Sequence, residues 1–312
     1  MNALKAKYLE IFNSIDFEGI KDHPNVLIAA SFWDENRIEA AKTFYRFMRS
    51  IDDMIDNHKA VHGYINEDEK KQFTEEVNNW LKTILDGNGI DQLHQELTKN
   101  ILKFRIPVWP LEAFANSMIY DINNSGFRTM EDFLNYSAGA SVAPAAIFVH
   151  LAGLREQEHK YSAPAFNVKE ATTSCAVFSY IVHIIRDFQK DQLNNLNYFA
   201  GDIITRNGLK NEDLYLIAKG SPVTAGFRSM MKEYYNTADH YRLKTLDCIK
   251  AIWPYLEPRY QLSFEIIFEL YLMVFERIDP DKGYFTSEEL NPTASEIKAR
   301  VLRTIENSRT LH

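Results

Sequence analysis

The sequence has little cysteine: Cys175 and Cys248 are the only two in 312 residues. Two cysteines supply neither a disulfide framework nor the spacing of a cysteine-rich metal site, so we expect a reducing compartment, the cytoplasm. A basic block is also missing, because 35 Lys and Arg residues are interspersed with 43 Asp and Glu residues and leave a net charge of −8. This charge excludes nucleic acid as an expected partner.

An apolar run of about 18–20 residues, enough to span a bilayer, is not found either. The first ten residues carry Lys5, Lys7 and Glu10 and lack the apolar centre of a signal peptide. We therefore expect a soluble enzyme that reaches any lipid substrate without spanning a membrane, with peripheral membrane contact serving product release. Repeats, low-complexity stretches and flexible linkers are absent, which predicts a single domain over residues 1–312.

What the sequence has in abundance is apolar residues, 46% of the chain, spaced three and four apart. No sustained alternation of apolar and polar residues accompanies them, so the spacing predicts an all-α fold. Pro144, in a run of small residues over 137–146, is expected to kink its helix. The helices are predicted over residues 4–12, 25–32, 34–57, 66–86, 91–105, 111–124, from 129 onward, 167–191, 223–252, 257–278 and 293–308.

Three acids stand within five positions of the helix predicted over residues 34–57: Asp52, Asp53 and Asp56. Residues four apart share a helix face, so Asp52 and Asp56 point the same way among apolar neighbours. Like charges at that spacing cost roughly 0.2–0.5 kcal/mol per pair, and partial burial raises this cost. A divalent cation would relieve it.

A second acid pair with the same spacing, Asp187 and Asp191, ends the helix predicted over residues 167–191. If the two helices face each other, their carboxylates suit Mg²⁺, which proteins hold with a few acids and the phosphates of a substrate. Zinc is not expected without His or Cys clusters. Such a site neutralises a departing diphosphate, and the faces of 20 Phe, 16 Tyr and 4 Trp are available to stabilise the carbocation left behind.

The same features also occur in helices that have only a structural role. Either acid pair alone is more often part of a salt-bridged helix surface, and aromatic residues at helical spacing are more often core. Two acid pairs that both lie in apolar helices favour metal binding instead. The residues therefore predict an enzyme that ionises the diphosphate of an apolar chain.

These two acid stretches resemble the aspartate-rich segments of the squalene/phytoene synthase family. Residues 44–56 are similar to the first segment, residues 186–191 to the second, and residues 197–202 continue as the family does. The resemblance covers about residues 30 to 300. Other positions that follow in family order are Ser31 with Phe32, Met118 with Asp121, Tyr136, and Tyr271.

The resemblance implies a single-domain, all-α isoprenoid-synthase bundle with a central cavity. It implies the head-to-head condensation of two prenyl diphosphates, farnesyl or geranylgeranyl, through a cyclopropyl diphosphate to squalene, dehydrosqualene or phytoene. It also implies two or three Mg²⁺ ions. NADPH stays an open option, because no glycine-rich dinucleotide motif indicates it and the reductive members of the family lack one too. The oligomeric state and the chain length of the substrate are not indicated.

The resemblance also assigns roles to individual residues. Mg²⁺ would be held by Asp52, Asp53, Asp56, Asp187 and Asp191. Substrate contacts would come from Ser31, Tyr45, Arg49, Tyr136, His183 and Arg186. Tyr271 would face the reacting centre and would carry catalysis together with Asp52, Asp56, Asp187 and Asp191.

The chain departs from the family pattern near its second motif. His183 stands where the family has Asn, Tyr180 where it has Gln, and Leu196 where it has Arg. Imidazole is a poor ligand for Mg²⁺, so His183 is either a hydrogen-bond donor to diphosphate or a core histidine. Two other functions therefore stay open. One is ionisation of a single prenyl diphosphate followed by cyclisation or hydrolysis, and the other is a non-catalytic homologue used for lipid binding or assembly.

Overall fold

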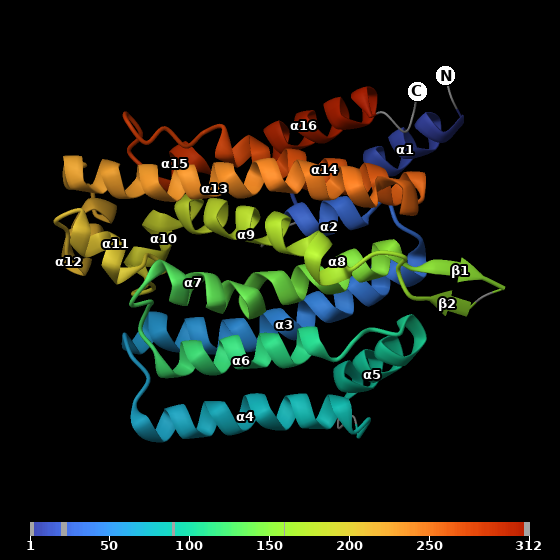
Figure 1. The fold of residues 1–312 in the computed structure, drawn as a ribbon, viewed down its shortest axis with the longest axis horizontal. Coiled ribbons are helices and arrows are strands. Elements are labelled where there is room, and N and C mark those ends of the chain that lie inside the picture. Colours follow the sequence, from blue (N-terminus) through green and yellow to red (C-terminus); the bar gives the residue numbers. More distant parts are fainter. Residues whose placement is uncertain (1–2, 20–23, 89–90, 159, 309–312) are drawn as a thin grey trace.

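The computed structural model describes residues 3–19, 24–88, 91–158 and 160–308 (Figure 1). Its regular structure is helical apart from one short antiparallel hairpin, β1 (Arg155–Gln157) with β2 (Lys160–Ser162), which confirms the predicted all-α class. The helices are α1 (Ala3–Ser14), α2 (Pro24–Ala30), α3 (Glu35–His62), α4 (Glu67–Leu85), α5 (Gln92–Phe104), α6 (Trp109–Asn123), α7 (Met130–Ser137), α8 (Ala143–Gly153), α9 (Val168–Arg186), α10 (Phe188–Leu193), α11 (Gly201–Arg206), α12 (Asn211–Ala218), α13 (Ala225–Ile252), α14 (Pro258–Phe275), α15 (Ser287–Leu290) and α16 (Ala294–Asn307).

Two predicted helix starts are confirmed by their capping geometry. Asn66 accepts from the backbone N–H of Glu69, whose side chain accepts from the N–H of Asn66. Thr129 and Asp132 form the same reciprocal pair at the start of α7. Each pair satisfies backbone donors that a helix start leaves without partners.

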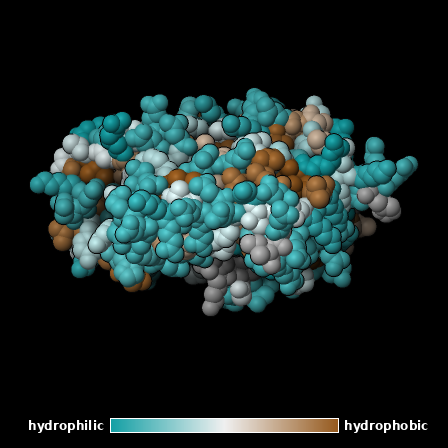
Figure 2. All heavy atoms as spheres, turned by 90° about the horizontal axis from the view of Figure 1, so that it is seen from below, coloured by the Kyte–Doolittle hydropathy of each residue, from teal (hydrophilic) through white to brown (hydrophobic). Residues whose placement is uncertain are grey.

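The long helices lie side by side, and α9 is central among them (Figure 1). It packs against α8, α13 and α14, while α3 packs against α5, α6 and α8, and α4 covers α6 from outside. The core between them is aromatic and aliphatic, with Phe44, Phe178 and Phe227 fully buried. The face seen from below in Figure 2 is mostly hydrophilic, with apolar patches between the charged side chains.

The kink expected at Pro144 takes the form of a π-helical turn, η1 (Ala138–Val142), just before that proline. Proline has no N–H, and its ring clashes with the carbonyl one turn earlier, so the widened turn accommodates it. Gly139 lies in this turn with no room for a side chain, since a Cβ there would come within 2.0 Å of the Ala113 carbonyl oxygen. The turn therefore brings α6 into direct backbone contact.

One helical stretch, Met130–Gly153, is long and apolar enough to cross a membrane by length and composition. The sequence prediction that no such run exists is therefore wrong as stated. The stretch comprises α7, η1 and α8, and 67% of its apolar window is buried within the protein. Core helices of soluble proteins meet the same two criteria, and this stretch packs against α6 and α9.

Candidate active site

The first acid motif lies in the middle of α3, whose buried face carries Phe44, Ile51 and Ile55. Arg49, one turn earlier, pairs with two of the three acids. Its Nη1 lies 3.0 Å from Oδ2 of Asp52, and its Nη2 lies 2.6 Å from Oδ1 of Asp53. Asp56 has no such ion pair in the described part of the chain, and it accepts a 3.4 Å hydrogen bond from the hydroxyl of Tyr198.

The second acid motif lies where α9 gives way to α10. Asp187 is the residue between the two helices, and it is bound by two neighbours. Arg186 donates from Nε to Oδ1 at 2.7 Å and from Nη2 to Oδ2 at 2.8 Å. His183 Nε2 lies 2.8 Å from the same Oδ2. The carboxylate of Asp191, one turn further on, has no hydrogen bond or ion pair within the described residues.

The fold brings the two motifs close enough for the carboxylates of one motif to raise the pKa of the carboxylates of the other. Burial raises the pKa of Asp56 well above its usual range, with Asp52, Asp121 and, from α10, Asp191 adding to the effect. Burial also raises the pKa of Asp191 to about 8, with contributions from Asp187 and, across the bundle, Asp52. The pKa of Asp52 rises to about 6, mainly through burial and in spite of Arg49.

Aromatic side chains form a wall beside these acids. The ring of Tyr180 stacks on Phe133 with centroids 5.5 Å apart, and lies 6.3 Å from Tyr136 and 6.4 Å from Tyr198. Burial raises the pKa values of the three tyrosines well above their usual range, and the nearby carboxylates raise them further. The hydroxyls therefore stay protonated, and the ring faces provide the electron density that stabilises a cation.

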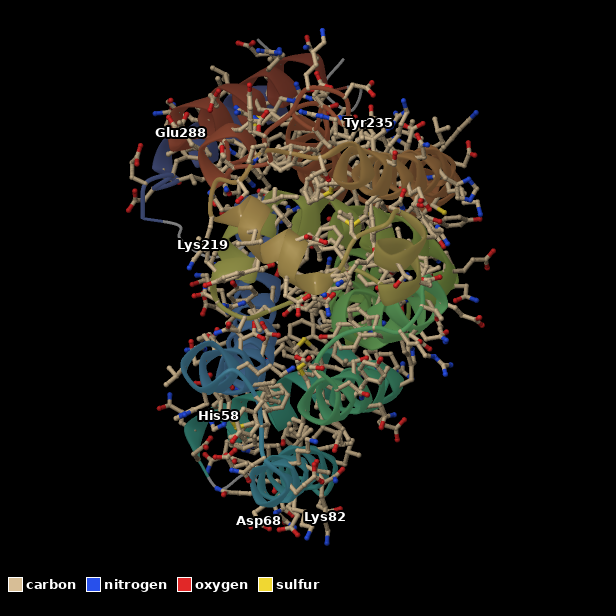
Figure 3. All side chains as sticks on the ribbon, turned by 90° about the vertical axis from the view of Figure 1, so that its left-hand side faces the viewer. His58, Asp68, Lys82, Lys219, Tyr235 and Glu288 are labelled. Carbon is tan, nitrogen blue, oxygen red and sulfur yellow. The ribbon has the colours of Figure 1, made fainter. Side chains whose placement is uncertain are left out.

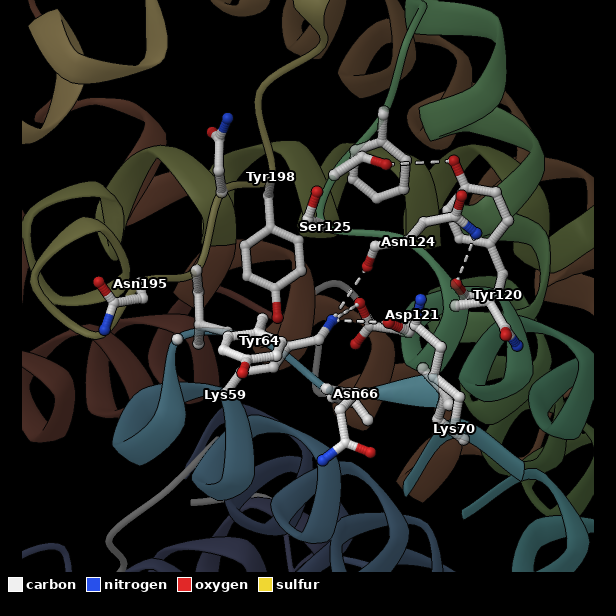
Figure 4. A pocket seen from close by; sticks show the side chains of 18 of the residues that line it. Lys59, Tyr64, Asn66, Lys70, Tyr120, Asp121, Asn124, Ser125, Asn195 and Tyr198 are labelled. Carbon is white, nitrogen blue, oxygen red and sulfur yellow. Dashed lines mark hydrogen bonds and ion pairs between the residues drawn. The ribbon is translucent and has the colours of Figure 1, made fainter. Parts of the chain in front are cut away.

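A cavity of about 450 Å³ opens beside Asp121 and Tyr198, at the end of the bundle seen in Figures 3 and 4. It is lined by the α3–α4 loop, the α6–α7 loop and residues 195–198. At its edge the ammonium of Lys59 donates to Oδ1 of Asp121 at 2.5 Å, and to the carbonyls of Asp121 and Asn124 at 2.7 and 3.3 Å. Sequence reasoning gave Lys59 no role, although it follows Asp56 by one turn of the same helix.

The remaining predicted residues lie in two places. Tyr271 of α14 lies near the second motif, where burial raises its pKa to about 12 and Arg186 and Asp187 act on it. Its hydroxyl bonds with Asn25, a buried residue of α2 that sequence reasoning missed. Ser31 follows the opposite end of α2, and its hydroxyl donates to the carbonyl of Leu27 in its own helix.

Tyr45 precedes Arg49 by one turn of α3 and interacts with it electrostatically. It therefore lies beside the first motif, and its contact with diphosphate stays a prediction. No local pattern in the sequence indicated that Asn25 would bond with Tyr271, because the two residues lie on different helices.

The donor set fits a hard cation only in part. Asp56 and Asp191 offer carboxylate oxygens without a protein cation, which is the chemistry that Mg²⁺ prefers. Asp52 shares its charge with Arg49, and both oxygens of Asp187 are bound within the protein. Among the described residues, no group of three or more His, Cys, Asp or Glu side chains is arranged to hold a metal.

Comparison with known proteins gives a family match and similar folds. The family model described as squalene/phytoene synthase matches residues 21–295. No curated protein matches the chain by sequence. A dehydrosqualene synthase solved in complex with ligand is 15% identical, with a TM-score of 0.69 over 96% of this chain and 97% of that one.

Two further solved structures share the fold. The squalene synthase HpnC from Alicyclobacillus acidocaldarius is 13% identical, with a TM-score of 0.63 over 94% of this chain and 98% of that one. YisP from Bacillus subtilis subsp. subtilis strain 168 is 13% identical, with a TM-score of 0.59 over 96% of this chain and 98% of that one. At such identities the likeness shows a common fold.

Proposed function

Because the chain belongs to the squalene/phytoene synthase family, we propose that it is a Mg²⁺-dependent prenyl transferase. It joins two prenyl diphosphates, farnesyl or geranylgeranyl, head to head through a cyclopropyl diphosphate to squalene, dehydrosqualene or phytoene. The observation that carries this proposal is the meeting of Asp56 from α3 and Asp191 from α10, two partly buried carboxylates that form no ion pair within the described residues, beside a wall of tyrosines.

The chain's own residues divide the work of ionising a diphosphate. Asp56 and Asp191 would hold the ion, and bound Mg²⁺ would neutralise charge on the departing diphosphate. Arg49 and Arg186 add fixed positive charge at the two motifs. Tyr136, Tyr180 and Tyr198 lie close enough to the acids of the first motif for the carboxylates to raise their pKa values. In this proposal their rings would stabilise a carbocation and exclude water from it.

A second function, ionisation of one prenyl diphosphate followed by cyclisation or hydrolysis, is favoured by Tyr180. This ring packs against Phe133, Tyr136 and Tyr198, close to the acids. We infer that it narrows the space for a second prenyl chain. The cavity of about 450 Å³ at this end, lined by Asp121 and Tyr198 rather than by the acids of the two motifs, is in the size range of a site for a single small ligand.

A product assay separates the two functions. Purified protein is incubated with Mg²⁺ and farnesyl or geranylgeranyl diphosphate, with and without NADPH, and the extracted products are identified by mass. A C30 or C40 hydrocarbon supports condensation, whereas a C15 or C20 alcohol or cyclic hydrocarbon supports the second function. If folded protein releases no pyrophosphate from either substrate, both enzyme functions are wrong. The hypothesis that is left is a non-catalytic homologue used for lipid binding or assembly.

In the same assay we expect Asp52→Asn to lower kcat at least ~100-fold. The substitution removes the carboxylate that pairs with Arg49 and acts electrostatically on Asp56 and Asp191. Circular dichroism should show an unchanged fold. Asp247→Asn, which removes an exposed carboxylate of α13, is the matched control and should keep the wild-type rate. A wild-type rate in Asp52→Asn would contradict the assignment of the first motif.

A further inference from the structure

The two acids of the second motif, Asp187 and Asp191, have different neighbours and therefore different roles. We infer that Asp187 is a positioning residue that holds Arg186 toward the diphosphate, and that it is not a metal ligand. The α9–α10 side would then give the metal one carboxylate, Asp191. This inference rests on the proposed function and makes its site more specific, since the resemblance assigned both acids of the motif to Mg²⁺.

The first evidence for this inference is that both oxygens of Asp187 accept hydrogen bonds from Arg186. Its Oδ1 accepts from Arg186 Nε at 2.7 Å, and its Oδ2 accepts from Arg186 Nη2 at 2.8 Å. Such a two-pronged pair between a guanidinium and a carboxylate is among the strongest side-chain contacts in proteins. The two side chains are only 14% and 11% exposed. A metal bound across both oxygens of Asp187 would have to displace Arg186 and leave a nearly buried cation without its partner, which is strongly destabilising.

His183 takes a third acceptor position of this carboxylate, which has about four, and so leaves one on Oδ1. Its Nε2 lies 2.8 Å from Oδ2 of Asp187, so that oxygen already has two partners. A carboxylate only accepts hydrogen bonds, so Nε2 must carry the proton in this contact and has no lone pair for a metal. The ring thus acts through Asp187, which differs from the direct donation to diphosphate considered for His183 from the sequence.

The guanidinium of Arg186 is held with one end available. Its Nε and Nη2 are bound to Asp187, whereas Nη1 has no hydrogen bond within the described residues. Tyr271 of α14 and Asp191 of α10 both lie close enough to raise the pKa of Arg186. Planar, two-pronged binding of phosphate is the contact for which Arg is better suited than Lys.

The test separates metal binding from pyrophosphate binding. Mn²⁺ binding is counted from the electron paramagnetic resonance signal of the free ion, and the affinity for inorganic pyrophosphate in saturating Mn²⁺ is measured by calorimetry. We expect Asp187→Asn to bind as many Mn²⁺ ions as the wild type, with a Kd within about threefold. Asp191→Asn, the matched control with the same chemical change, should weaken Mn²⁺ binding at least tenfold.

Pyrophosphate affinity should follow the opposite order. Asp187→Asn and Arg186→Lys should each lower it about tenfold, and the double variant should lower it no further, because both changes remove one Arg–carboxylate unit. Arg186→Lys leaves Asp187 in place, so it carries the test if Asp187→Asn does not fold.

The contradicting outcomes are distinct. Loss of a Mn²⁺ ion in Asp187→Asn, as in Asp191→Asn, or additive losses of pyrophosphate affinity, would overturn the inference alone. If the expected binding pattern holds but no prenyl diphosphate is turned over, the proposed function fails and the inference stands. A wild-type protein that binds no Mn²⁺ overturns both.

Discussion

Acids of one chemical type play different roles in this site because their neighbours differ. Arg49 binds Asp52 and Asp53, Lys59 binds Asp121, and Arg186 binds Asp187. Asp56 and Asp191 lack such a cation. A partly buried carboxylate without an ion pair either keeps a proton or binds a metal, so the protein's own cations determine which acids are left for these two outcomes.

His183→Asn tests what the imidazole contributes. Arg186 keeps both of its hydrogen bonds to Asp187 when the imidazole is removed, and the Asn amide oxygen adds a donor that suits Mg²⁺. We expect kcat to stay within about threefold of the wild type or to rise. The measurement is steady-state pyrophosphate release, and complete loss of activity would show that the imidazole has a chemical role of its own.

Lys59→Met tests the buried pair with Asp121, whose side chains are 10% and 13% exposed. Removing one partner leaves the other charge buried alone, which costs about 3–5 kcal/mol of unfolding free energy. We expect this loss in urea unfolding, and we expect the double variant Lys59→Met, Asp121→Asn to recover most of it. Exposed Lys82→Met on α4 is the control and should change stability by less than about 0.5 kcal/mol. Equal effects of the two lysine variants would contradict the buried-pair interpretation.

At the scale of elements, the periodicity and caps of the sequence predicted the long helices, but not the places where tertiary contacts decide the backbone. The helix predicted over residues 167–191 is interrupted at Asp187, where no proline or glycine signals a break. Phe188, the next residue, is buried between Phe199 and Phe227, and Gln189 donates to the carbonyl of Ala218. These partners are distant in sequence, so no local pattern could indicate the break.

The short elements were missed for a different reason. Helices α11 and α12 and the β1–β2 hairpin have three to eight residues each, too few to establish a period. Helix α11 is instead fixed by its surroundings, since the N–H of Gly201 donates to the carbonyl of Phe127. Such contacts depend on the finished fold.

Gly139→Ala tests the contact between η1 and α6. A Cβ at this position would lie 2.0 Å from the Ala113 carbonyl oxygen and 2.2 Å from Ser117 Oγ, so the two helices would have to separate. We expect a loss of about 3 kcal/mol in unfolding free energy, at the upper end for overpacked cores. Ala138→Gly, at an exposed position of the same turn, should cost at most about 1 kcal/mol, through helix propensity alone. A Gly139→Ala protein as stable as the wild type would mean that the turn has room to move.

For the whole molecule, the sequence predicted which acids matter but not how they are neutralised. The i, i+4 spacing alone indicated Asp52 with Asp56 and Asp187 with Asp191, because helix geometry fixes which side chains share a face. Lys59 and Asn25 escaped prediction, since their partners Asp121 and Tyr271 come from other helices. Spacing within a helix is readable from sequence, whereas pairing between helices is a property of the packed bundle.

The raised pKa values make stability depend on pH in a definite direction. The pKa of Asp191 is about 8 and that of Asp52 about 6 in the folded protein, against 3.8 for an unperturbed aspartate. Between pH 3.8 and these raised pKa values, Asp52 and Asp191 hold protons in the folded state that they have released in the unfolded state. Their contribution to stability therefore falls as the pH rises. Mg²⁺ competes with those protons, so its binding should strengthen over the same range.

We therefore expect Mg²⁺ to raise the Tm more at pH 8 than at pH 5.5. An ion at 100 times its Kd adds about 2.7 kcal/mol, which for a chain of this size is roughly 5 °C, and at pH 5.5 most of that shift should disappear. Differential scanning calorimetry with and without Mg²⁺ at the two pH values measures it, with Asp191→Asn as the control that should lose the pH 8 shift. An equal Mg²⁺ effect at both pH values, or a full shift in Asp191→Asn, would place the ion away from the two facing carboxylates.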